Sequence, residues 1–79
     1  AEDAFRRQLA IARYNEHFQG QIYGLNNLGG LLLKRGNPTA AQAVFEEALT
    51  IAKNIESQEG QGISLSNLGQ VAADTGNPT

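Results

Sequence analysis

The sequence contains no cysteine, methionine or tryptophan, and its 79 residues include a single histidine, His17. Without cysteine the chain can form neither a disulfide nor a thiolate metal site, and one histidine cannot build a metal cluster alone. No apolar run approaches the roughly 20 residues that a membrane-spanning helix needs, and no basic-then-apolar signal segment opens the chain. We therefore expect a cytoplasmic protein that has no metal, no cofactor and no contact with a membrane.

Charged residues are also scarce, at 18% of the sequence, and the formal net charge is −2. The six basic residues are spread over several parts of the chain rather than clustered. Phosphate binding depends on a surplus of clustered lysine and arginine. The composition therefore argues against nucleic acid as a partner.

The sequence does contain an internal repeat, because residues 1–39 align with residues 41–79 without a gap. The identical positions, numbered in the first copy, are Ala1, Phe5, Leu9, Ile11, Ala12, Glu16, Gly20, Gln21, Leu25, Asn27, Leu28, Gly29 and the run Gly36, Asn37, Pro38 and Thr39. A fixed period between about 20 and 50 residues is the signature of a solenoid. Two adjacent positions reverse their charge between the copies, since Arg6 and Arg7 align with Glu46 and Glu47. Two interpretations stay open: the reversed charges set the register of stacked repeats, or they form an ordinary solvated face.

The apolar spacing inside each copy is helical, as in Phe45, Leu49 and Ala52 at i, i+4 and i+7. Gly36 suits the left-handed position after a helix end, and Asn37 with Pro38 suits the start of the next helix. Ser57 is a candidate N-cap at the other junction, where the first copy has His17. The sequence therefore predicts an all-α fold with four helices at about 2–16, 18–35, 38–56 and 58–75.

Mid-helix glycine costs roughly 1 kcal/mol relative to alanine. Gly29 and its equivalent Gly69 lie on the expected core face. We expect a neighbouring helix to pass so close to each that a Cβ is excluded. Leu31 and Leu33 are interpreted as packing between repeats rather than as a hydrophobic groove.

These residues resemble the tetratricopeptide repeat. Leu25, Leu28 and Gly29 with the Gly36-Asn37 turn resemble the family's first helix, and Ala41-x-x-x-Phe45-x-x-Ala48-Leu49 resembles its second. The family's usual period is 34, whereas this chain has a period of 40, which resembles the long-repeat branch found in cell-polarity adaptors, kinesin light chains and bacterial signalling regulators. The family's proline after the second helix is replaced by Lys53, and Gln8 stands where the family has a small residue. The resemblance implies a right-handed α-solenoid of antiparallel helix hairpins.

The resemblance also divides the chain. Residues 1–17 would be the second helix of a partial repeat, residues 18–57 one full repeat, and residues 58–79 the first helix of a further repeat with its cap. Because about three repeats are normally needed for stability, two interpretations stay open. The chain is an excerpt of a longer solenoid, or the ends of different molecules associate head to tail.

In this family the first-type helices line the concave face and bind peptides. Carried across by position, the residues expected to contact a peptide are Tyr23, Asn26, Asn27, Gly30, Lys34, Ile63, Ser66, Asn67, Gln70 and Asp74. Asn27 and Asn67 are the sharpest candidates, because an amide offers a donor and an acceptor to a peptide backbone; the alternative is that they bond to neighbouring polar groups or to water. The family's carboxylate clamp needs more basic residues than Lys34 and is expected to be absent.

No catalytic motif appears. The Gly60-x-Gly62 pair lacks the third glycine of a dinucleotide fingerprint, and His17 has no nucleophile and carboxylate at motif spacing. We therefore expect a non-catalytic interaction module or scaffold that binds a protein or peptide. The alternative is a structural element that associates with itself through its open ends and that a charge at Ile11 would disrupt.

Overall fold

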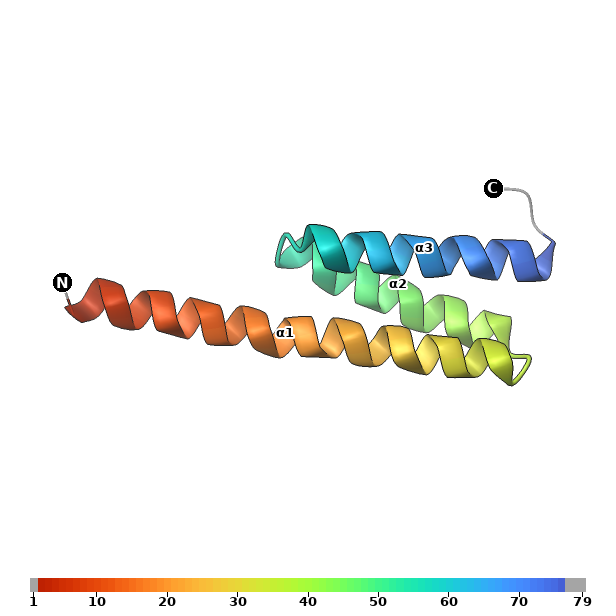
Figure 1. The fold of residues 1–79 in the computed structure, drawn as a ribbon, viewed down its shortest axis with the longest axis horizontal. Helices are drawn as coiled ribbons and strands as arrows, with labels where there is room; N and C mark the ends of the chain where they lie inside the picture. Colours follow the sequence, from red (N-terminus) through yellow and green to blue (C-terminus); the bar gives the residue numbers. More distant parts are fainter. Residues whose placement is uncertain (1, 77–79) are drawn as a thin grey trace.

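A computed structural model of the chain describes the backbone of residues 2–76 and the side chains of residue 7 and residues 15–76. It consists of three helices, α1 (Glu2–Lys34), α2 (Pro38–Asn54) and α3 (Gln58–Thr75), and residues 2–76 contain no strand. The three helices alternate in direction, so that α1 and α3 run the same way and α2 runs back between them (Figure 1). The molecule measures 55 Å along its longest axis, and α1 sets this length, because 33 helical residues span about 50 Å.

The predicted all-α class is confirmed, but the predicted break between helices at 2–16 and 18–35 is wrong. These two segments form the single helix α1. A helix start needs a side chain that accepts a hydrogen bond from the N–H groups of the first turn. His17 lies instead within hydrogen-bonding distance of Gln21 one turn on, with 3.0 Å between His17 Nε2 and Gln21 Nε2, and the helical backbone continues through it.

The Gly36-Asn37-Pro38 junction has the predicted conformation. Gly36 has a φ of 79°, the left-handed region in which glycine carries no steric penalty. Asn37 caps α2 by accepting a hydrogen bond from the N–H of Ala40 at 3.3 Å, and Pro38 is the first residue of the helix. The second copy of this signature ends at residues 77–79, which lie outside the described residues, as does the side chain of Ile11.

The junction between α2 and α3 is a tight turn. The second helix ends at Asn54 rather than at the predicted residue 56, because Glu56 adopts a left-handed φ of 56°. The turn is closed by the N–H of Ser57, which donates to the carbonyl of Ala52 at 2.8 Å. Ser57 is the predicted N-cap, and its hydroxyl accepts from the N–H of Gly60 at 3.0 Å.

The core lies along α2, which contacts both neighbouring helices. One buried cluster consists of Ile22, Ala48 and Ala52, with Ile51 and Ile55 packed against it. A second cluster consists of Ala41, Phe45 and Val71, and the half-buried Leu32, Leu33 and Leu68 pack against it. Among the described residues, no helix has the length and apolarity that crossing a membrane requires.

The expectation of close approach at glycine is confirmed at Gly29 only. A Cβ built on Gly29 would overlap the ring of Phe45, with Phe45 Cζ at 2.6 Å, whereas a Cβ on Gly69 would meet nothing within 4 Å. Phe45 is fully buried, so its ring sits in the notch that Gly29 leaves open. No neighbouring helix lies close to Gly69 in the structure.

The difference between Gly29 and Gly69 extends along both helices, because α1 and α3 are buried on opposite faces. In α3 the buried or half-buried positions include Gly60, Leu68 and Val71, which lie against α2, and Ser64, which bonds to α1. Their equivalents one repeat earlier in α1 are all exposed or nearly half exposed; we call them the upstream face, and they are Gly20, Gly24, Leu28 and Leu31. Conversely, α3 exposes Gly62, Leu65, Ser66 and Gly69, which we call the downstream face. Leu31, expected to pack between repeats, is 45% exposed.

Candidate functional site

A hydrogen-bonded polar network joins α1 to α3. Asn26 is 8% exposed and Ser64 is fully buried. The Asn26 amide nitrogen donates to the carbonyl of Ile22 at 2.9 Å and to the hydroxyl of Ser64 at 3.1 Å. Its carbonyl oxygen accepts from the amide of Asn67 at 2.8 Å. Asn26 thus makes three hydrogen bonds inside the protein, and this network fixes α3 beside α1.

A second interhelical bond lies nearer the start of α3. The hydroxyl of Tyr23, on α1, donates to the carboxylate of Glu59 at 2.7 Å. Tyr23 is 40% exposed, so its ring borders the surface while its hydroxyl bonds to α3. Tyr23 is therefore part of the contact between the two helices.

The ten predicted site residues fall into three groups. Asn26 is buried, while Gly30, Ile63 and Asn67 are half-buried. The exposed members are Tyr23, Asn27, Lys34, Ser66, Gln70 and Asp74. Of these, Gln70 donates to Asp74 at 2.9 Å within α3. Asn67 makes an internal hydrogen bond, which was the alternative interpretation for Asn27 and Asn67, and Asn26 is bonded internally as well.

The exposed members lie on the solvent-facing sides of α1 and α3, and Ser66 among them belongs to the downstream face of α3. Asn27 and Lys34 lie on α1 at a spacing of seven residues, and Ser66, Gln70 and Asp74 lie at helical spacings on α3. Among the described residues, Asn27 and Ser66 make no side-chain hydrogen bond. This surface offers amide, hydroxyl and charged groups to a ligand, with Lys34 as its basic group.

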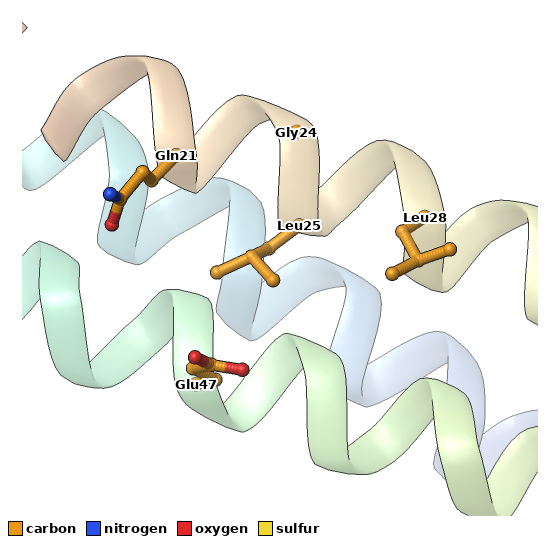
Figure 2. Close-up of a pocket in the computed structure, with 5 residues that line it drawn as sticks. All are labelled: Gln21, Gly24, Leu25, Leu28 and Glu47. Atoms are coloured by element: carbon orange, nitrogen blue, oxygen red, sulfur yellow. The ribbon is translucent and has the colours of Figure 1, made fainter. Parts of the chain in front are cut away.

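A hollow of about 460 Å³ lies on the other side of α1, between α1 and α2. It is lined by Gln21, Gly24, Leu25 and Leu28 from α1 and by Glu47 from α2. Figure 2 shows both leucines and Gln21 pointing toward α2, with the Glu47 carboxylate opposite them. No lining residue comes from α3. The hollow therefore has an apolar floor and one acidic side chain at its α2 edge.

The hollow was not expected from the sequence, and neither were Ser64 and Glu59 as hydrogen-bond partners of α1. The hollow had a signal in the repeat, because Leu28 and Leu31 align with Leu68 and Val71, which pack against α2. Ser64 had no such signal, since its equivalent is Gly24. The described residues contain no cluster of three or more histidine, cysteine, aspartate or glutamate side chains that could hold a metal ion.

Three antiparallel helices that repeat one sequence unit, with small residues at the helix crossings and capped turns between the helices, define a helical-repeat protein. A family model for the tetratricopeptide repeat matches residues 20–79, and the chain belongs to this family. Tetratricopeptide repeats generally mediate protein–protein interactions and typically have no catalytic role.

The match begins at Gly20 and so leaves out the whole N-terminal half of α1. No curated protein and no solved structure matches the chain. The division into units at 1–17, 18–57 and 58–79 stays a prediction, and α1 passes through its first boundary without a break.

Proposed function

We propose that the chain binds a peptide segment of another protein along the seam between α1 and α3. The observation that supports this proposal is the fixed side-by-side placement of the two helices by Asn26 and Tyr23. Because these bonds hold the two helices together, the backbone positions that carry the exposed groups are fixed before a ligand arrives. Preorganised groups lose less conformational entropy on binding.

The residues proposed to contact the peptide are now fewer than the sequence suggested. Asn27, Lys34 and Ser66 are exposed, and Asn27 and Ser66 have unused hydrogen-bonding groups that suit the N–H and C=O groups of an extended peptide. Gln70 and Asp74 would first have to give up their mutual bond. The proposed ligand is therefore an internal segment of a peptide with little net charge. A free C-terminal carboxylate fits less well, because Lys34 is the one cationic group among the proposed contact residues.

The test uses peptides selected from a displayed random library against the full chain. Asn27→Ala should weaken binding of the selected peptides by about 5- to 10-fold, because a hydrogen bond contributes about 0.5–1.5 kcal/mol. Asn54→Ala is the matched control, since Asn54 is also exposed but ends α2. Isothermal titration and helical circular dichroism of each variant separate binding from folding.

If the native chain, Asn27→Ala and Ser66→Ala all bound the selected peptides with equal affinity, the seam proposal would be wrong. Asn67→Ala is not a suitable test, because it leaves the buried Asn26 carbonyl oxygen without its donor, which costs about 1–3 kcal/mol of stability.

Self-association is the second candidate function, and the exposed leucines support it. Leu28 is 46% exposed, Leu31 45% and Leu65 55%. Leu28 and Leu31 lie on the upstream face and Leu65 on the downstream face, so a head-to-tail contact between the two faces of different copies stays a prediction.

A further inference from the structure

The upstream face of α1 has the sequence of a surface that is buried elsewhere in the same molecule. In α3 the equivalents Gly60, Leu68 and Val71 lie against α2, and Val71 is only 3% exposed, whereas its equivalent Leu31 is 45% exposed. Gly20 and Leu28 have identical equivalents in α3, and Leu31 is apolar like its equivalent, so a covering helix would meet a similar surface on both. The covering helix of α1 should therefore have the sequence pattern of α2.

The chain contains a second segment with this pattern. Residues 1–16 repeat α2 at Ala1, Phe5, Leu9, Ile11 and Ala12, which align with Ala41, Phe45, Leu49, Ile51 and Ala52. This segment cannot cover α1 of its own chain, because it continues α1 as one helix. Its backbone projects beyond the ends of α2 and α3, away from the rest of the molecule (Figure 1).

We propose that two copies of the chain form a symmetric dimer in which residues 2–16 of each copy cover the upstream face of the other. The occupant of the hollow between α1 and α2 is then the N-terminal half of the second copy's α1. Such a reciprocal exchange is an isologous, closed contact of the domain-swapped kind. It does not depend on the peptide-binding seam, which lies between α1 and α3.

The pairing follows from the contact between α2 and α3. The Cβ of Ala52 lies 3.1 Å from a Cβ built on Gly60. One repeat earlier these positions are Ala12 and Gly20, whose midpoint along the chain is Glu16. In an antiparallel pair of straight α1 helices, Ala12 of one copy then lies opposite Gly20 of the other, around a two-fold axis near Glu16. Since α1 runs from Glu2 to Lys34, this axis falls close to the middle of the helix, and the two helices overlap along nearly their whole length.

The charges favour the same arrangement. Glu47 lies at the α2 edge of the hollow, and Glu46 beside it is exposed. Residues 1–16 contain three of the chain's six basic residues, Arg6, Arg7 and Arg13. In stacked repeats, consecutive α2-type helices are neighbours, so the arginines of one copy would meet the glutamates of the other. Complementary charges of this kind fix register and exclude wrong partners.

The first experiment is sedimentation equilibrium of the full chain. We expect one dimer, whose population rises with concentration and then stops at two copies. A chain that stays monomeric from ~1 µM to ~1 mM has no contact worth more than about 4 kcal/mol, and that result would overturn the proposal. So would a series of ever larger oligomers, which is the result that open head-to-tail association gives.

A pair of matched variants identifies the face. Leu31→Glu places a charge on the upstream face and should raise the dimer dissociation constant by ~10-fold or more, because an unpaired charge would be buried. Leu65→Glu makes the same change on the downstream face and should leave the constant unchanged. Both leucines are about half exposed, so neither variant should unfold the chain, and circular dichroism checks this. Loss of the dimer in Leu65→Glu alone would overturn the proposal in favour of the downstream face.

Cysteine cross-linking tests the pairing directly, because the native chain has no cysteine. A mixture of the single variants Ala12→Cys and Gly20→Cys should form a disulfide between chains under mild oxidation. A cysteine fits at Gly20, where a Cβ meets nothing within 4 Å. In one straight helix these two residues are about 12 Å apart, too far for a disulfide. An intrachain disulfide in the double variant, with no cross-linked dimer in the mixture, would show that residues 2–16 fold back within one chain and would refute the exchange.

Discussion

The segments 14–35 and 54–75 are two copies of one sequence unit, and the structure gives them different conformations. In the second copy, Glu56 adopts a left-handed backbone and Ser57 starts a helix. In the first copy, Glu16 is the same residue at the same position, yet it lies inside α1. Among the residues that differ around this position is the cap, since His17 replaces Ser57. The copy that has a capping side chain forms a turn here, and the copy that lacks one continues as a helix.

The two copies differ in the same way in their packing. The helix α3 is covered on the face that α1 leaves open, and α1 is covered on the face that α3 leaves open. Each helix therefore presents to solvent a surface that is buried in its counterpart. The shared sequence pattern sets which surfaces can be buried, while the position of each helix in the stack decides which surface is buried.

The largest expected effect comes from giving the first copy the turn of the second. The double variant Glu16→Gly with His17→Ser supplies a left-handed residue and an N-cap at the missing break. We expect residues 2–16 to fold back as a separate helix and the proposed dimer to become a monomer, with its dissociation constant raised at least ~10-fold. Sedimentation of the variant measures this. An unchanged dimer would mean that the cap does not control the break.

The next comparison uses the glycines at the helix crossings. Gly29→Ala should destabilise the fold by about 1–3 kcal/mol, because its Cβ would overlap the buried ring of Phe45. Gly69→Ala, the same change one repeat later, should stabilise it by about 0.5–1 kcal/mol, since the site is open and alanine is the better helix former. Urea denaturation gives both values. A shift of the same sign in both variants would contradict the notch at Gly29.

The caps provide a smaller contrast. Ser57→Ala removes the acceptor for the N–H of Gly60 and should cost about 1 kcal/mol of unfolding free energy. His17→Ala alters an exposed residue within a continuous helix and should change the stability by less than about 0.5 kcal/mol. Thermal unfolding followed by circular dichroism at 222 nm measures the stability change of each variant. If His17→Ala cost as much as Ser57→Ala, the first copy would have a capped helix start after all.

The smallest expected effect concerns the left-handed residue of the turn. Glu56→Gly should stabilise the chain by about 0.5–1 kcal/mol, because a left-handed conformation costs a non-glycine residue about 1–2 kcal/mol and glycine recovers part of this. Glu16→Gly, made alone, should cost about 0.5–1 kcal/mol, as glycine does inside a helix. Equal signs in chemical denaturation would show that the two glutamates share one backbone conformation.

The sequence by itself determined the helical class, the repeat and most of the helix ends. Local signals were enough at Gly36, Asn37, Pro38 and Ser57, because each acts on backbone groups within a few residues. The apolar spacing likewise placed Phe45 and Ala52 in the core, since burial of one face is the main source of helix stability in a small fold. The family could also be recognised at this level.

The tertiary structure decided what the repeat could not. Aligned positions of α1 and α3 have different neighbours, so Gly29 meets a ring and Gly69 meets none. The same effect turned Asn26 from a predicted ligand contact into a buried bridge between helices. An amide is equally suited to bind a peptide or a neighbouring side chain, and only the position of Ser64 and Asn67 on the adjacent helix settles which of these it does.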